Sequence, residues 1–344
     1  MTSSASPVGR RAPRPRFRVL AFAGAGCGVL LFVAAASVAL GSRVIGAQQV
    51  VQGLLHTGPA DIVTLVREVR VPRTAAGLVA GAALGAAGIL VQAVTRNPLG
   101  DPGLLGVNSG SGFAVTLTVA LTGSTGVTAT VWSAFAGAAA VTALIVAVAG
   151  ATGSRHPGKL VLVGVALGAV LSGIQAALTL LDPRTLDTMR TWSAGTLAGI
   201  PPGTTAFLTL FVAAGLTAAL TVAKGLDISA MGEELAMGLG TRTHLTRVVA
   251  IAAITLLAGS ATALAGPLSF LGLMVPHLLR PLIGPGTRRL LLGSLIAGPV
   301  LLLTADVAAR LVARPGELPV GVVTAFLGAP LLLLLLHSRK GRIR

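Results

Sequence analysis

The sequence predicts an all-α integral membrane protein with ten transmembrane helices and both termini in the cytoplasm. The chain has 344 residues, of which 53% are hydrophobic and only 10% are charged, whereas a soluble domain carries about 25% charged residues. Most stretches between turn signals are apolar over the roughly 20 residues that a helix needs to cross a bilayer. A β-barrel would instead show apolar and polar residues alternating in segments of about ten, and the sequence lacks that alternation.

The first apolar run, residues 19–40, follows a basic lead, residues 1–18. This run is longer than the 7–15 residues of a secretory signal core, and no small-residue cleavage site follows it. It is therefore predicted to be the first span. The predicted spans are residues 19–41, 74–94, 104–121, 127–150, 160–181, 203–223, 247–265, 268–283, 290–312 and 318–337.

The distribution of lysine and arginine indicates the orientation. The lead, alternate loops and the tail after residue 338 hold 18 of the 26 Lys and Arg residues. The other set of loops holds the remaining eight: Arg43, Arg67, Arg70, Arg73, Arg184, Arg190, Arg310 and Arg314. Cytoplasmic loops carry the excess of positive charge, so both termini are predicted to be cytoplasmic. The formal net charge of +16 is explained by basic residues that gather at the ends of spans as topology signals. Because aromatic side chains on which bases could stack are few, we expect no binding of nucleic acid.

Glycine and proline interrupt the chain at residues 95–112 and again at 265–282. Backbone of this kind is tolerated at membrane depth only where it is buried in protein or lines a wet cavity.

The second half of the chain also contains one unusual loop, residues 224–247, "KGLDISAMGEELAMGLGTRTHLTR". Its apolar residues recur at near-helical spacing, which predicts one or two short amphipathic helices at the membrane surface. They would rest on lipid headgroups or on a protein; the adjacent acids Glu233 and Glu234 favour a protein partner.

No catalytic or metal-binding constellation is present in the sequence. It has no G-x-x-x-x-G-K-[ST] string for a nucleotide, its five histidines lack a second ligand at helical spacing, and Cys27 is the only cysteine. Asp306 is the one acid expected inside a span, and an ion pair with Arg310 at i,i+4 accounts for it without a proton relay. The chain is thus predicted to be no enzyme and to hold no cofactor or metal.

Five strings, in this order, resemble the FecCD-type permease subunits of bacterial ABC importers for iron–siderophores, haem and vitamin B12. They are "RVPRTAAGLVAGAALGAAGILVQAVTRNPLGDPGLLGVNSGSG", "LVLVGVALGAVLSG", "MGEELAMGLG", "AGPLSFLGLMVPHLLRPLIG" and "ELPVGVVTAFLGAPLLLLLL". They cover nearly all of the chain beyond the first helix. Each string alone is a loose membrane pattern, but their order and spacing together are specific.

The resemblance implies a vitamin B12 permease-like fold with a transmembrane permease domain, residues 19–338, and a basic tail, residues 339–344. It makes residues 224–247 the coupling loop for a partner ATPase, with Met231, Glu233, Glu234 and Leu235 in contact. It also implies that the fifth and tenth spans wall the translocation pathway. The residues expected to line the pathway are Gly164, Gly168, Ser172, Gln175, Thr324 and Gly328.

The resemblance further implies a cytoplasmic gate in the loops after the second and fourth spans. The matching residues are Asn97 and Leu99 in "NPLGD", and Pro157 and Gly158 in "RHPGK", where the B12 member has small hydroxyl residues instead. Docking of an extracytoplasmic binding protein is implied for Arg70, Arg73 and Arg310. The alternative for these outer arginines is that they anchor the chain to lipid phosphates.

The implied function is import of an Fe(III)–siderophore complex into the cytoplasm, with cobalamin or haem as the alternative cargo. Implied partners are a second permease subunit, identical or paralogous, two cytoplasmic ATPase subunits that bind ATP and Mg²⁺, and the substrate-binding protein. The expected location is the bacterial inner or plasma membrane. An ion-coupled secondary transporter is the rival function, which the scarcity of intramembrane acids disfavours.

Overall fold

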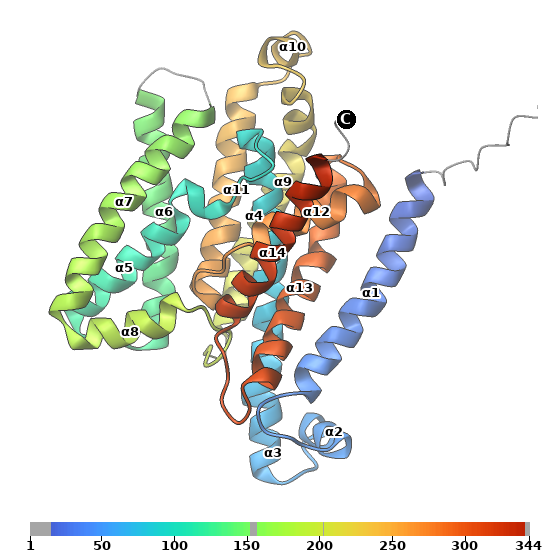
Figure 1. Cartoon of the computed structure of the whole chain (residues 1–344), viewed down its shortest axis with the longest axis vertical. Helices are drawn as coiled ribbons and strands as arrows, with labels where there is room; N and C mark the ends of the chain where they lie inside the picture. The colour runs from blue at the N-terminus through green and yellow to red at the C-terminus, as the bar shows by residue number, and fades with distance from the viewer. Residues whose placement is uncertain (1–14, 152–156, 202, 341–344) are drawn as a thin grey trace, which may run out of the picture.

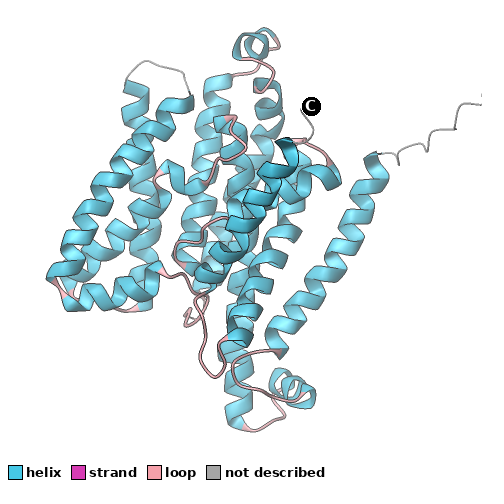
Figure 2. Cartoon of the chain, viewed as in Figure 1, coloured by secondary structure: helices cyan, strands magenta, loops and turns pink. Residues whose placement is uncertain are grey.

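The computed structural model describes residues 15–151, 157–201 and 203–340, and the regular elements among them are all helical (Figure 2). The predicted basic lead up to residue 14, the loop residues 152–156 and the last residues of the tail, 341–344, lie outside the described residues. The elements are α1 (Pro15–Ala39), α2 (Ala47–Leu55), α3 (Ala60–Thr64), η1 (Leu65–Arg70), α4 (Val71–Thr95), η2 (Pro102–Leu105), α5 (Val107–Thr122), α6 (Val127–Ala151), α7 (Pro157–Leu181), α8 (Pro183–Ser193), α9 (Thr204–Ser229), α10 (Glu233–Gly238), α11 (Thr243–Ala265), α12 (Leu271–Ile283), α13 (Thr287–Val312) and α14 (Val320–Lys340).

Each of the ten predicted spans coincides with one helix. Seven segments of the described chain are long and apolar enough to cross a membrane. They contain α1, α4, α6, α7, α9, α11 and α13. The other three predicted spans are shorter helices: α5 has 16 residues, α12 has 13, and the apolar part of α14 is Val320–Pro330. The all-helical membrane fold is therefore confirmed, while the count of ten crossings stays a prediction.

The two ends of the described chain lie at the same end of the molecule. In Figure 1 the start of α1, the end of α14 and the short helix α10 are at the top, whereas α2, α3 and α8 are at the bottom. The charge bias predicts that both termini lie on one side of the membrane. Such an arrangement requires an even number of crossings. We refer to these as the α10 end and the α2 end.

Helix α4 lies at the centre of the molecule and is buried along most of its length. It is packed closely because it has glycine where neighbouring backbones approach. A Cβ built at Gly81 would lie 2.7 Å from the Gly298 carbonyl oxygen of α13, and one at Gly88 would lie 2.0 Å from the Gly272 oxygen of α12. Small residues at helix contacts are the usual way that membrane helices pack.

The interrupted stretch after α4 separates the central helices from a second group, α5, α6 and α7 (Figure 1). Helix α4 ends with Arg96 in a left-handed conformation, φ 51°, and α5 begins after Gly106, φ 74°. Between them the Asp101 carboxylate accepts a hydrogen bond from the Gly103 backbone nitrogen at 2.9 Å and caps η2. The prediction that residues 95–112 form no ordinary helix is confirmed for residues 96–106 but wrong for residues 107–112, which are the first turns of α5.

Candidate functional site

A groove runs along α7 where this helix faces η2, α5 and the end of α8. Its volume is about 360 Å³. Four of the predicted pathway residues line it: Gly164, Gly168, Ser172 and Gln175. The lining also contains nine residues that the sequence analysis did not name individually: Gly103, Leu104, Asn108, Ser109, Gly112, Val165, Trp192, Ser193 and Pro267.

Glycines on α7 let η2 and α5 approach this helix closely beside the groove. A Cβ at Gly164 would lie 2.3 Å from the Leu104 carbonyl oxygen, and one at Gly168 would lie 3.1 Å from the Ser109 hydroxyl. The polar groups along the groove are hydroxyls and amides, and none of the thirteen lining residues is ionisable. Such a surface can offer weak hydrogen bonds to a passing molecule but no strong electrostatic attraction, which suits passage better than tight binding.

Thr324 and Gly328 of α14, the other two predicted pathway residues, do not line the groove. Thr324 is buried, and its hydroxyl donates to the Gly321 carbonyl oxygen at 3.0 Å. A Cβ at Gly328 would lie 2.3 Å from Cβ of Phe270. The pathway prediction is wrong for these two residues within this chain, because both face the core beside α12.

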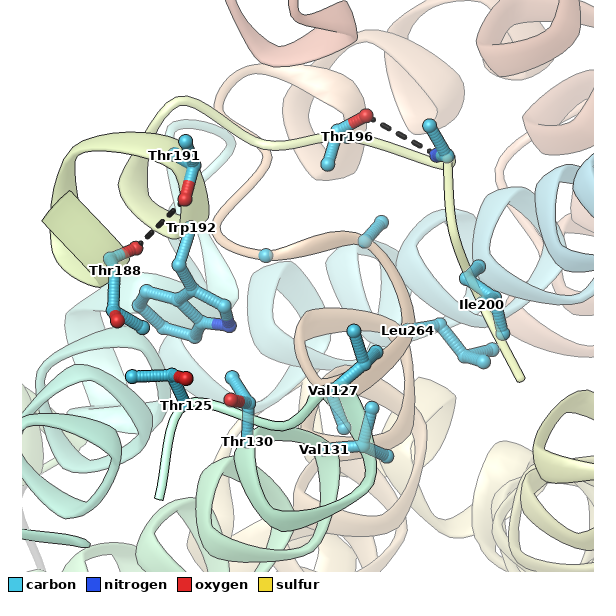
Figure 3. Close-up of a pocket in the computed structure, with 14 residues that line it drawn as sticks. Thr125, Val127, Thr130, Val131, Thr188, Thr191, Trp192, Thr196, Ile200 and Leu264 are labelled. Atoms are coloured by element: carbon cyan, nitrogen blue, oxygen red, sulfur yellow. Dashed lines mark hydrogen bonds between the residues drawn. The ribbon is translucent and has the colours of Figure 1, made fainter. Parts of the chain in front are cut away.

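A smaller pocket of about 150 Å³ adjoins the groove at the α2 end of the molecule. Threonine hydroxyls and aliphatic side chains from α6, α8, α11 and the linker after α8 surround it (Figure 3). Trp192 lines both the pocket and the groove. Its indole nitrogen is buried and has no hydrogen-bond partner among the described residues. Trp192 therefore forms the wall between the two spaces.

At the α10 end, the loop predicted to couple to an ATPase forms a short helix that projects from the body (Figure 1). Met231 and Leu235 are 69% and 49% exposed, and Met237, Leu239 and Leu245 are exposed beside them. The sequence analysis named Met231 and Leu235 as contacts but not Met237, which lies in the same string, "MGEELAMGLG", nor Leu245, which lies beyond it. Exposed apolar residues gathered in one place indicate an interaction surface.

The two acids of this loop differ in their surroundings. The Glu233 carboxylate lies 3.7 Å from the Arg247 guanidinium at the start of α11, so it is engaged within the chain. Glu234 is exposed. A cavity of about 400 Å³ lies between α10 and the start of α11. It is lined by Glu233, Met237, Thr241, Arg242, Thr243, His244, Leu245 and Arg247.

The predicted gate residues lie near the same end. Asn97 and Leu99 are exposed in the turn after α4, where the Asn97 side-chain oxygen accepts a hydrogen bond from the Leu99 backbone nitrogen at 2.9 Å. Asparagine commonly forms such local turns. Gly158 is exposed in the first turn of α7, which begins at Pro157; the Pro157 side chain lies outside the described residues.

At the α2 end, the three predicted docking arginines are buried. Arg70, Arg73 and Arg310 are 3%, 4% and 2% exposed. The prediction that they form an exposed docking surface is therefore wrong, and so is the alternative that they anchor the chain to lipid phosphates. Their actual partners belong to this chain.

Two of these arginines hold the end of α1. Arg70 donates to the Val38 and Ala39 carbonyl oxygens at 3.0 and 2.6 Å. Arg310 donates to the Ser37 and Leu40 oxygens at 3.0 and 2.7 Å. The last carbonyls of a helix have no partner within the helix and carry partial negative charge, so cations stabilise them.

The third arginine joins a buried ion cluster. The Asp306 carboxylate lies 2.8 Å from the Arg73 guanidinium and 2.9 Å from that of Arg310, and it is fully buried. The predicted i,i+4 pair with Arg310 is thus confirmed, while the contact with Arg73 was missed because 233 residues separate the partners. Arg73 also binds Glu317 at 2.6 Å. Burial alone would raise the pKa of Glu317, but the hydrogen bond and charge of Arg73 hold its pKa below the usual value.

No group of three or more His, Cys, Asp or Glu side chains converges on a possible metal site within the described residues. His277, which lies near a proline in α12, has its Nδ1 atom 2.8 Å from the Leu273 carbonyl oxygen. This contact supports a structural role for that histidine.

Comparison with known proteins agrees with the arrangement of the helices. The FecCD transport family matches residues 29–338. The chain is 43% identical to the ferric enterobactin transport system permease protein of Escherichia coli (strain K12), over 90% of this chain and 93% of that protein. It is 40% identical to the vitamin B12 import system permease protein of Serratia proteamaculans (strain 568), over 80% and 82% of the two chains.

The fold is also found in a solved structure, an inward-facing conformation of a metal-chelate type ABC transporter. The two chains superpose with a TM-score of 0.80 at 24% identity, and the match covers 94% of this chain and 99% of the other. The family match over most of the sequence and the relatives above 30% identity lead to one conclusion: this chain belongs to the FecCD transport family and is a multi-pass membrane permease of the ABC importer type.

Proposed function

We propose that this protein is the permease subunit of a bacterial importer that carries an Fe(III)–siderophore complex into the cytoplasm. The observation that supports the proposal best is the 43% identity to a ferric enterobactin permease over nearly the whole of both chains. A partner ATPase supplies the energy by hydrolysing ATP, and a substrate-binding protein delivers the chelate at the α2 end. The complex contains two permease subunits and two ATPase subunits and lies in the inner or plasma membrane, with all ten apolar helices crossing and both termini inside.

The groove along α7 is the part of the pathway contributed by this chain. Its uncharged lining of glycines, hydroxyls and amides accommodates a bulky chelate without holding it. The buried ion cluster argues against the rival function, an ion-coupled transporter. Asp306 is ion-paired with two guanidiniums of the same chain, so a structural cluster accounts for this acid without an ion pathway.

Cobalamin is the alternative cargo, because a vitamin B12 permease is 40% identical to this chain; haem is a further alternative. These cargoes can be separated by measuring uptake into proteoliposomes that contain the permease, its ATPase and its cognate binding protein. Radiolabelled iron enters if an Fe(III)–siderophore is the cargo. Uptake of labelled cobalamin or haem alone would overturn the siderophore proposal while leaving the importer proposal intact.

The ATPase contact can be tested on the exposed apolar residues of the coupling loop. Combining Met231→Asp with Leu235→Asp places two charges in the proposed interface. We expect the ATPase to be lost from the purified complex and uptake to stop, because unpaired charges are costly to bury at a protein interface.

The matched control combines Val44→Asp with Leu55→Asp, which adds the same charges to residues 75% and 66% exposed at the α2 end. This control should retain the ATPase. If the ATPase co-purifies in normal amount with the Met231 and Leu235 double variant, the coupling loop is wrongly assigned.

A further inference from the structure

We propose that Arg96 is a positioning residue that ties the predicted gate turn to the coupling loop, so that movement of α10 moves residues 97–99. This inference rests on the proposed function. It concerns Arg96, a residue to which the resemblance assigns no role. Its main observation is a hydrogen bond between segments more than a hundred residues apart. Three features of the structure carry it.

The first feature is the hydrogen bond that Arg96 makes across the fold. Its guanidinium Nη2 donates to the Ser229 carbonyl oxygen at 2.5 Å. Ser229 is the last residue of α9, where helix carbonyls lack internal partners and favour a cation. Arg96 is exposed, and its ionised donor makes a charge-assisted hydrogen bond that connects the end of α4 to the end of α9.

The second feature is that the Ser229 oxygen also accepts from the start of the coupling loop. The Gly232 backbone nitrogen donates to it at 3.3 Å, and Gly232 is followed directly by α10. Helix α10 is in turn held to α11 by the Glu233–Arg247 pair at 3.7 Å, and the Thr241 nitrogen in the linker between the two helices donates to the Ala236 oxygen of α10 at 2.9 Å. One carbonyl oxygen is therefore shared by Arg96 and the segment that meets the proposed ATPase.

The third feature is the stiffness of the turn that follows Arg96. Within it the Asn97 backbone oxygen accepts from the Gly100 nitrogen at 2.9 Å, and the Asn97 side chain accepts from the Leu99 nitrogen. Arg96 itself has the left-handed φ of 51°, a conformation that is unfavourable for a residue with a side chain and persists only where its surroundings hold it. Displacing the Arg96 side chain would consequently move residues 97–100 as one unit.

The experiment compares Arg96→Gln and Arg96→Lys with the natural chain in the complete complex with its ATPase and binding protein. Glutamine removes the charge and shortens the reach, so the connection to Ser229 is lost. Lysine keeps the charge but replaces the guanidinium fork with a single ammonium group. We expect uptake per ATP hydrolysed to fall at least several-fold for Arg96→Gln and less for Arg96→Lys, while ATPase association stays normal.

A second readout follows the gate turn directly. In a Cys27→Ala background, the labelling rate of Leu99→Cys should differ between nucleotide-free and ATP-bound complexes, and Arg96→Gln should remove that difference. The control is Arg288→Gln, which removes one exposed charge near the start of α13 at the α10 end. This control should keep both the coupling ratio and the nucleotide response.

If Arg96 only caps α9, the glutamine variant will lower stability and leave uptake per ATP and the response of position 99 unchanged, and the inference is overturned. If no ATPase co-purifies with the natural chain, it is the proposed function that fails. Purification of the natural complex, without any substitution, therefore distinguishes a failure of the proposed function from a failure of the inference about Arg96.

Discussion

At the scale of single residues, the ion cluster at the α2 end shows how a membrane chain accommodates several buried charges. The negative charges of Asp306 and Glu317 offset the positive charges of Arg73 and Arg310. Backbone carbonyl oxygens of α1 accept hydrogen bonds from the guanidinium groups that are not fully engaged by carboxylates. Arginine suits this position because its planar group can bind a carboxylate and carbonyls together. The cluster thereby fastens α1, α4, α13 and the loop before α14 to one another.

Asp306→Asn should therefore destabilise the subunit strongly. Removing one partner of a buried ion pair leaves an uncompensated charge and costs about 3–5 kcal/mol. Asp61→Asn is the matched control, because it breaks a pair with Arg43 in which both side chains are more than half exposed, and water and salt screen such pairs so that they contribute little to stability. Unfolding of the purified subunit in detergent measures both, and equal effects of the two substitutions would contradict the buried-cluster account.

At the scale of elements, glycine determines how closely the central helices pack. The contact between α4 and α13 brings the Gly81 carbonyl oxygen within 2.0 Å of where a Cβ of Gly298 would lie. Since that neighbour is backbone, no side-chain rotation can make room. The two helices have to move apart if either residue gains a side chain.

Gly298→Ala should consequently destabilise the subunit by about 1–3 kcal/mol, the usual cost of overpacking a core. Gly24→Ala on α1 is the control, because nothing lies within 4 Å of its built Cβ. There the substitution should stabilise by up to about 1 kcal/mol, since alanine favours a helix more than glycine does. Unfolding midpoints in detergent give the comparison, and a neutral Gly298→Ala would show that α13 can shift freely.

At the scale of the whole molecule, three features lie at different places along its length. The groove lies along α7, the proposed coupling loop and the predicted gate turn lie at the end that carries α10 (Figure 1), and the buried ion cluster lies at the α2 end. In the proposed importer, cargo enters at the α2 end, while the energy of ATP hydrolysis arrives at the α10 end. The helices between them, with α4 at the centre, have to transmit movement between the two ends.

Gly168→Phe should block the groove while sparing the fold. The nearest atom to a Cβ built at this position is the Ser109 hydroxyl at 3.1 Å, a side-chain group that can rotate away, so the phenylalanine ring would fill part of the groove of about 360 Å³. We expect most of the uptake to be lost, with ATPase association and subunit stability close to normal. Gly28→Phe on α1, where the built Cβ has nothing within 4 Å, is the control and should transport normally. Normal uptake by Gly168→Phe would remove this groove from the pathway.

The sequence by itself determined the class of this protein, the positions of ten of its helices, its family and two of the exposed apolar residues of the coupling loop, Met231 and Leu235. These properties depend on local composition, on charge bias and on the order of motifs, all of which can be read along the chain. The resemblance named four of the α7 residues that line the groove, Gly164, Gly168, Ser172 and Gln175, and their place in the translocation pathway stays a proposal. The i,i+4 pair of Asp306 with Arg310 was predictable because residues four apart in a helix are neighbours.

The tertiary structure alone decided which polar groups meet across the fold. Arg73 and Asp306 are 233 residues apart, and Arg96 and Ser229 are 133 apart, so no local pattern reveals either contact. It also decided that Arg70, Arg73 and Arg310 are buried and that Thr324 and Gly328 face the core. Burial depends on how helices pack against one another, and long-range packing, unlike helix formation or charge bias, leaves no periodic signal in the sequence.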